Sequence, residues 1–140
     1  MDLRKITDVF TVSPQIVPED VAEIAALGFK SIICNRPDGE EMGQCEFNLI
    51  ENAAHDAGLK FACVPITSGS VSQADMEDFH AAVDGLPNPI LAYCRTGTRC
   101  TMLWCIAQHG KMENADIVSA AADAGYDMAG LVGQLSRSGQ

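Results

Sequence analysis

The stretch LAYCRTGTRC, residues 91–100, decides how the chain is interpreted. An apolar run ends in Cys94, and two arginines, a glycine and two threonines fill the next five positions. This order predicts a buried strand over 87–94, a short loop, and a helix over 98–109. In open α/β sheets ligands bind at the carboxyl ends of strands. Cys94 therefore falls where a substrate would bind.

The residue types in this loop favour a reactive thiolate inside an anion-binding cradle. A helix N-terminus directs backbone N–H groups and a positive dipole at its ligand, and Gly97 permits a turn closed to other residues. Either arginine can bind an oxyanion through two parallel hydrogen bonds. Such surroundings lower a thiol pKa, and the thiolate is the nucleophile. We predict Cys94 and Arg99 as catalytic residues and an anion-binding loop of Arg95, Thr96, Gly97 and Thr98.

The rest of the chain alternates between strand and helix patterns. Further strands are expected at 8–13, 30–36 and 60–66, and further helices at 18–27, 45–58, 74–85, 113–125 and 127–136. This alternation predicts an α/β fold with a central, mostly parallel sheet of about four to five strands flanked by helices on both faces. A length of 140 residues suits one domain, 1–140.

The composition of the chain limits which kinds of binding partner and which compartment are expected. A net charge of −10 argues against nucleic acid and anionic membranes. The first residues lack the apolar core of a signal peptide and no apolar run is long enough to span a bilayer, so the cytoplasm is the expected compartment. The six cysteines lie mostly in apolar runs, which indicates reduced thiols. There is no C-x-x-C pair and the three histidines are scattered, so we expect no metal and no cofactor.

Four segments together carry a family resemblance: VSPQIVPEDV, GFKSIICNRPDGEE, GLKFACVPITSG and CRTGTRC. The chain resembles the bacterial phosphatase-like domain named after beta-lactamase-hydrolase-like proteins, members of which have also been labelled sulfur transferases. The resemblance runs nearly end to end. It implies a fold like that of dual-specificity and tyrosine phosphatases, with the catalytic cysteine in the loop after a strand.

Two kinds of enzyme use such a loop. Tyrosine-phosphatase-like enzymes carry His-Cys, five residues and Arg, whereas rhodanese-type sulfurtransferases carry a shorter loop. Here four residues separate Cys94 from Arg99, Cys100 stands where the phosphatase arginine belongs, and Tyr93 replaces the histidine. The loop therefore resembles a rhodanese loop on a phosphatase-like frame.

Phosphate-ester cleavage also needs a proton for the leaving oxygen. The segment TSGSVSQ after the strand at 60–66 has no acid where dual-specificity phosphatases place one. The acids that can substitute are Asp38, Glu40, Glu41, Asp75 and Asp78, the last two being better suited to capping or facing solvent. Sulfur transfer has no such requirement, because a thiolate attacks sulfur and forms a persulfide.

Three hypotheses follow for a small anionic substrate. The main one is sulfur transfer from a sulfane donor such as thiosulfate through a persulfide on Cys94, with a thiol as possible acceptor. The alternative is hydrolysis of phosphate monoesters through a phosphocysteine, and the third is a redox or anion sensor without turnover. Arg36 is expected either to help bind the anion or to pair with Asp38 or Glu41. Cys100 is expected either to pack at the helix start or to form a redox pair with Cys94.

Overall fold

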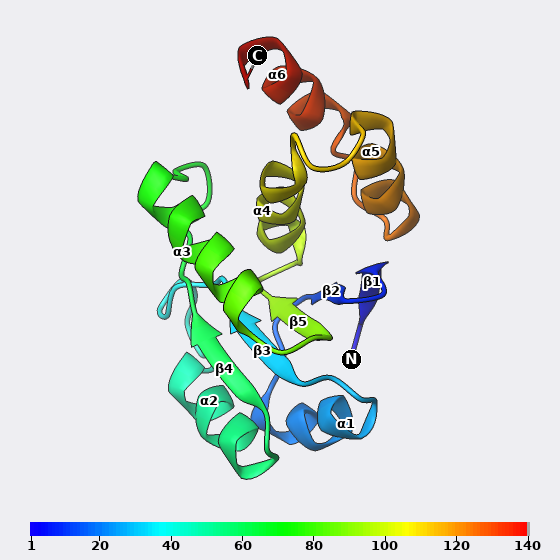
Figure 1. Ribbon diagram of the computed structural model, residues 1–140. Coiled ribbons are helices and arrows are strands. Elements are labelled where there is room, and N and C mark those ends of the chain that lie inside the picture. The colour runs from blue at the N-terminus through cyan, green and yellow to red at the C-terminus, as the bar shows by residue number, and fades with distance from the viewer. Residues whose placement is uncertain (140) are drawn as a thin grey trace.

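The computed structural model describes residues 1–139, and Figure 1 shows a central sheet between two layers of helices. The strand order is β1-β2-β5-β3-β4. Strand β1 is antiparallel to β2, and the other neighbouring pairs are parallel. The strands are β1 (Arg4–Thr7), β2 (Phe10–Ser13), β3 (Ser31–Cys34), β4 (Lys60–Cys63) and β5 (Ile90–Tyr93). The predicted fold class, an α/β fold with a mostly parallel sheet, is confirmed.

The helices follow the expected sequence. They are α1 (Val21–Ala26), α2 (Phe47–Asp56), α3 (Gln73–Gly85), α4 (Thr98–Gln108), α5 (Asn114–Asp123) and α6 (Ala129–Gly139), with a 3-10 turn η1 (Pro18–Asp20) before α1. Within residues 1–139, none of these helices is long and apolar enough to cross a membrane.

Strand β1 is the element that the sequence pattern missed. Only Ile6 of its four residues is buried, so neither a continuous apolar run nor a clear alternation marks it. The expected strand at 8–13 is shorter, because Asp8 and Val9 form the turn of a β1–β2 hairpin. A short polar strand at a sheet edge leaves little trace in hydropathy.

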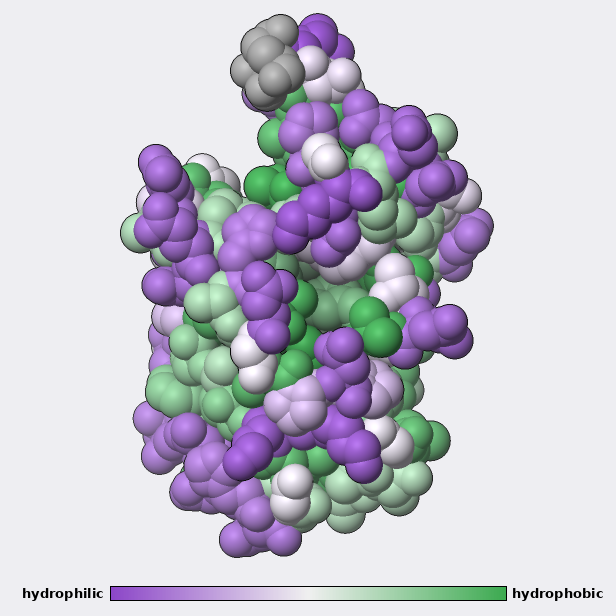
Figure 2. All heavy atoms as spheres, in the orientation of Figure 1, coloured by the Kyte–Doolittle hydropathy of each residue, from purple (hydrophilic) through white to green (hydrophobic). Residues whose placement is uncertain are grey.

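The sheet has a separate hydrophobic core on each face because neighbouring strand residues point to opposite sides. On one face, Ile32, Leu91 and Tyr93 pack in the core that α1 and α2 cover. On the other face, Ile33, Ala92 and Cys94 pack with α3, α4, α5 and α6. Figure 2 shows hydrophilic side chains over the outer surfaces of the helices, with hydrophobic ones visible between them.

This alternation places the adjacent residues Tyr93 and Cys94 in different cores. Tyr93 has an exposed fraction of 1%, and its hydroxyl is buried beside Cys34 in the core that α1 and α2 cover. The residue directly before the cysteine therefore does not act on the thiol side of the sheet.

Candidate active site

Cys94 lies in the loop between the end of β5 and the start of α4, as predicted. Its side chain is completely buried. The backbone N–H of Gly97 donates a hydrogen bond to the Cys94 sulfur at 3.1 Å. The pKa of Cys94 is lowered from 9.0 to about 5, first by the Cys100 thiol and then by the backbone N–H groups of Cys100, Gly97 and Thr96, against the effect of burial. At neutral pH the sulfur is a thiolate, the form that acts as a nucleophile.

The chain must turn sharply to direct these N–H groups at one atom. Gly97 has φ +89°, in the left-handed region, and it is the residue that precedes the first turn of α4. A residue with a Cβ is strained in that conformation, whereas glycine adopts it freely. Gly97 therefore forms the turn that the sequence predicts at this position.

Cys100 is fully buried directly beneath the loop, in the first turn of α4. Burial, followed by the neighbouring Cys94 sulfur, raises the pKa of Cys100 well above its usual value. The two thiols thus divide their roles, since Cys100 keeps its proton while Cys94 loses it. Redox pairing of the two cysteines remains a prediction.

Arg99 is held by Glu40 from the loop between β3 and α2. Its Nη1 donates to Glu40 Oε2 at 2.6 Å and to the Ile66 carbonyl at 2.8 Å, and its Nη2 donates to Glu40 Oε1 at 2.7 Å. These bonds use the end of the guanidinium group. Its side edge, formed by Nε and the second N–H of Nη2, has no protein acceptor within residues 1–139. That edge is the part of Arg99 that remains available for bidentate binding of an oxyanion.

Arg36 has a structural position rather than a place in the cradle. Its exposed fraction is 1%. It donates to Glu40 at 2.8 Å, to Gln15 at 3.0 Å and to Glu41 at 3.0 Å. Glu40 therefore bridges two arginines, and this bridge ties the β3–α2 loop to the start of α4.

Of the two partners expected for Arg36, the structure shows Glu41 and not Asp38. Asp38 instead accepts a hydrogen bond from the backbone N–H of Phe47 at 2.9 Å, at the start of α2. Satisfying a free N–H group of a helix start competes with the arginine for this carboxylate. Asp38 also does not line the cavity at the cysteine loop.

The exposed side of the loop borders a cavity of about 390 Å³. The predicted loop residues Arg95, Thr96, Thr98 and Arg99 line it, together with Glu40, Ser68, Gly69 and Met102. Arg95 is well exposed, and its Nη2 lies 3.8 Å from Glu41. The structure thus brings the predicted anion-binding side chains together at one opening, beside the loop that begins with the buried Cys94.

None of the acids that the sequence suggested as proton donors is placed for that role in the described residues. Glu40 lines the cavity, but its pKa is lowered to about 2 by Arg99 and Arg36, so it stays ionised. The pKa of Glu41 is also lowered, first by Arg36. Asp75 forms a capping box with Ser72 at the start of α3, and Asp78 is exposed on the same helix.

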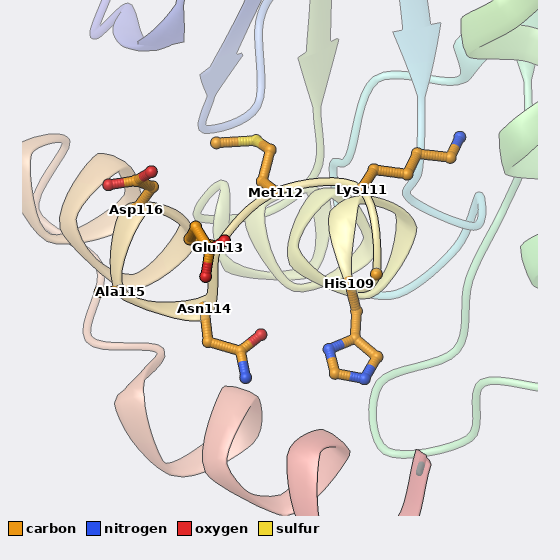
Figure 3. Close-up of a pocket in the computed structure, with 8 residues that line it drawn as sticks. His109, Lys111, Met112, Glu113, Asn114, Ala115 and Asp116 are labelled. Carbon is orange, nitrogen blue, oxygen red and sulfur yellow. The ribbon is translucent and has the colours of Figure 1, made fainter.

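A larger hollow of about 980 Å³ lies elsewhere, along the connection from α4 to α5 (Figure 3). Its lining is a single run of chain, residues 109–116. In Figure 3 the side chains of Lys111 and Met112 extend to the opposite side of this connection from those of His109 and Asn114. No residue of the cysteine loop lines this hollow, whereas four residues of that loop line the smaller cavity. The smaller cavity is therefore the candidate site, although Cys94 itself is buried and is not among its lining residues.

Comparison with known proteins agrees with this geometry. Over residues 2–111 the chain matches the family described as beta-lactamase hydrolase-like protein, phosphatase-like domain. A beta-lactamase hydrolase-like protein of Agrobacterium fabrum (strain C58) is 30% identical over 139 residues, which are 98% of this chain and 32% of that protein. The chain therefore spans about a third of the length of this curated relative.

Solved structures show the same fold. A candidate phosphatase from Neisseria meningitidis Z2491 is 36% identical, covers 98% of each chain and superposes with a TM-score of 0.86. The catalytic core of the yeast PP-IP phosphatase Siw14, solved with citrate, is 20% identical, with 99% of this chain and 85% of that chain covered and a TM-score of 0.70. The predicted likeness to the protein tyrosine phosphatase fold is thus confirmed.

Fold and family define a phosphatase-like domain. The chain belongs to the beta-lactamase hydrolase-like protein, phosphatase-like domain family. The family resemblance predicted from the four sequence segments is confirmed. The main functional hypothesis, sulfur transfer, finds no support in these comparisons, which favour the alternative of a phosphatase.

Proposed function

We propose that this domain hydrolyses phosphate monoesters through a phosphocysteine on Cys94. The observation that carries the proposal is the Cys94 sulfur, ionised by converging N–H groups and a buried thiol donor beneath Arg99, in a domain of the phosphatase-like family. The cysteine loop and the free edge of Arg99 form a cradle for the three non-bridging oxygens of a phosphoryl group.

The reaction has two displacement steps. The Cys94 thiolate attacks phosphorus, a P–S bond forms, and the bond from phosphorus to the leaving oxygen breaks. Water then attacks the phosphocysteine, the P–S bond breaks, and inorganic phosphate and the thiolate are released, with the proton of water passing to solvent or to phosphate. The loop N–H groups and Arg99 stabilise the charge on the phosphoryl oxygens in both steps.

The substrate follows from the acids around the cavity. Glu40 is ionised and the other candidates have different contacts, so the leaving oxygen departs without a carboxylic acid to protonate it. We infer that preferred substrates have leaving groups that are stable as anions, such as acidic phenols or a phosphate group of a phosphoanhydride. Citrate in the yeast relative shows that this fold accommodates a multiply charged anion in that protein.

A series of aryl phosphates with leaving groups of different pKa tests the proposal. We expect kcat/KM to fall steeply as the leaving-group pKa rises, by about tenfold for every one to two units, because protonation does not assist departure. Cys94→Ser should remove turnover, and Arg99→Lys should lower it by impairing bidentate binding. A flat dependence on leaving-group pKa would reveal a general acid and refute the inference about substrate class.

Sulfur transfer remains a second candidate because of one feature of the loop. Only four residues separate Cys94 from Arg99, which is the shorter, rhodanese-like spacing. This hypothesis predicts that thiosulfate adds one sulfur atom to Cys94, measured by intact mass beside Cys94→Ser. A sulfur-free protein with a fully alkylatable Cys94 would eliminate thiosulfate as the donor.

A further inference from the structure

Tyr126 contacts the cysteine loop from a distant part of the chain. It lies between α5 and α6, outside the residues 2–111 that match the family. Its exposed fraction is 8%. Its hydroxyl donates a hydrogen bond to the carbonyl oxygen of Thr96 at 2.9 Å, across 30 positions of sequence.

The accepting carbonyl belongs to the same peptide group as the N–H of Gly97. A trans peptide group is planar, so its C=O and N–H point in opposite directions. The Thr96 end is bound to Tyr126 and the Gly97 end is bound to the Cys94 sulfur, at 3.1 Å. A bond that fixes the carbonyl therefore also fixes the direction of the N–H.

A glycine on one side of this peptide group restricts its rotation less than another residue would. Rotation changes ψ of Thr96 and φ of Gly97, and glycine accepts values of φ that other residues do not. The Tyr126 hydroxyl packs so closely on Gly97 that an added Cβ would collide with it. Tyr126 thus packs directly against Gly97, the residue whose flexibility the turn requires.

The ring of Tyr126 is itself held in place by β1. The guanidinium carbon of Arg4 lies 5.3 Å from the ring centroid, within the range of a cation–π interaction. Arg4 Nη1 also donates to the Ala124 carbonyl at 3.3 Å, two residues before the tyrosine. The edge strand and the α5–α6 connection together present the hydroxyl to the loop.

We propose that Tyr126 is a positioning residue that fixes the Thr96–Gly97 peptide plane so that the Gly97 N–H points at the Cys94 sulfur. The proposal deepens the proposed function, because it concerns the thiolate on which that function rests. Its direct consequence is a change in thiol ionisation, which can be measured without any substrate. Its failure and the failure of the phosphatase proposal are therefore distinguishable.

The test is the pH dependence of iodoacetamide alkylation of Cys94 in Tyr126→Phe, followed by peptide mass. We expect the midpoint of the alkylation profile to rise by about one pH unit relative to the parent, because the thiolate loses an aligned N–H donor. The chain contains two tyrosines, which offers a matched control. Tyr93→Phe also removes a buried hydroxyl, next to Cys94 but in the other core, and should leave the midpoint unchanged.

A second variant, Arg4→Met, keeps the hydroxyl but removes the cation and the bond to Ala124. It should shift the midpoint in the same direction by less than Tyr126→Phe does. Circular dichroism and thermal unfolding establish that each variant is folded. Equal midpoints for the parent and both variants would overturn the proposal, as would an equal shift in Tyr93→Phe.

Discussion

Replacing Cys100 tests how the domain lowers the pKa of its nucleophile. The Cys100 thiol is the largest cause of the low Cys94 pKa, and Cys100→Ala removes it. A hydrogen bond to a charged group contributes about 1.5–3 kcal/mol, and a thiol is a weak donor, which favours the low end of that range. Since about 1.4 kcal/mol corresponds to one pKa unit, the Cys94 pKa should rise from about 5 to about 6.

Alkylation by iodoacetamide measures this shift. At pH 5.5 the rate for Cys94 should fall about threefold in Cys100→Ala, whereas at pH 8 both proteins are fully ionised and should react alike. Cys100→Ser is the matched control, because a hydroxyl donates a stronger hydrogen bond to the thiolate and should keep the midpoint at or below that of the parent. Cys94→Ser gives the background from the other five cysteines. Coincident midpoints for the parent and the alanine variant would refute the reasoning.

Two further predictions concern the charges around the loop. Glu40→Gln should lower kcat/KM for an aryl phosphate about tenfold, since an amide replaces one of the two oxygens that orient Arg99. Glu41→Gln weakens partly exposed contacts to Arg36 and Arg95 but none to Arg99, so it should change kcat/KM less than twofold. Equal effects of the two substitutions would contradict the orienting role of Glu40. The low Cys94 pKa also makes stability depend on pH: the thiolate contributes stability above the unfolded-state pKa, and this contribution is lost as pH falls through the folded-state pKa of about 5. The difference in unfolding free energy between the parent and Cys94→Ser should therefore shrink by a few kcal/mol between pH 9 and pH 5, on the order of 1.4 kcal/mol per pKa unit. A difference that stays constant over this range in denaturant titrations would contradict the low pKa of Cys94.

The parts of the site that lie close in sequence were predictable. The end of β5, the turn at Gly97 and the start of α4 lie within one short stretch, so the pattern around Cys94 locates the thiolate and its N–H donors. Periodicity also placed the strands on both sides of β5. The edge strand β1 escaped detection because Ile6 is its single buried residue.

The parts that depend on distant contacts were not predictable. Glu40 and Arg99 are 59 positions apart, and Tyr126 and Thr96 are 30 apart, and neither pair forms a local motif. Glu40 was therefore considered only as a possible acid, whereas its two arginine partners keep it ionised. The expectation of sulfur transfer came from the spacing of Cys94 and Arg99, from Tyr93 in place of a histidine and from the missing acid, whereas the family and fold favour phosphatase chemistry.

The central claim is that Cys94 carries the phosphoryl group during turnover. The most direct measurement is the intact mass of the protein after millisecond mixing with p-nitrophenyl phosphate and quenching in denaturant at alkaline pH, where the P–S bond of a phosphocysteine is more stable than in mild acid. The account predicts a gain of one phosphoryl group, mapped to the peptide that contains Cys94 and absent from Cys94→Ser. Release of nitrophenol by the parent with no phosphorylated Cys94 peptide at any mixing time, or equal hydrolysis by Cys94→Ser, would contradict it.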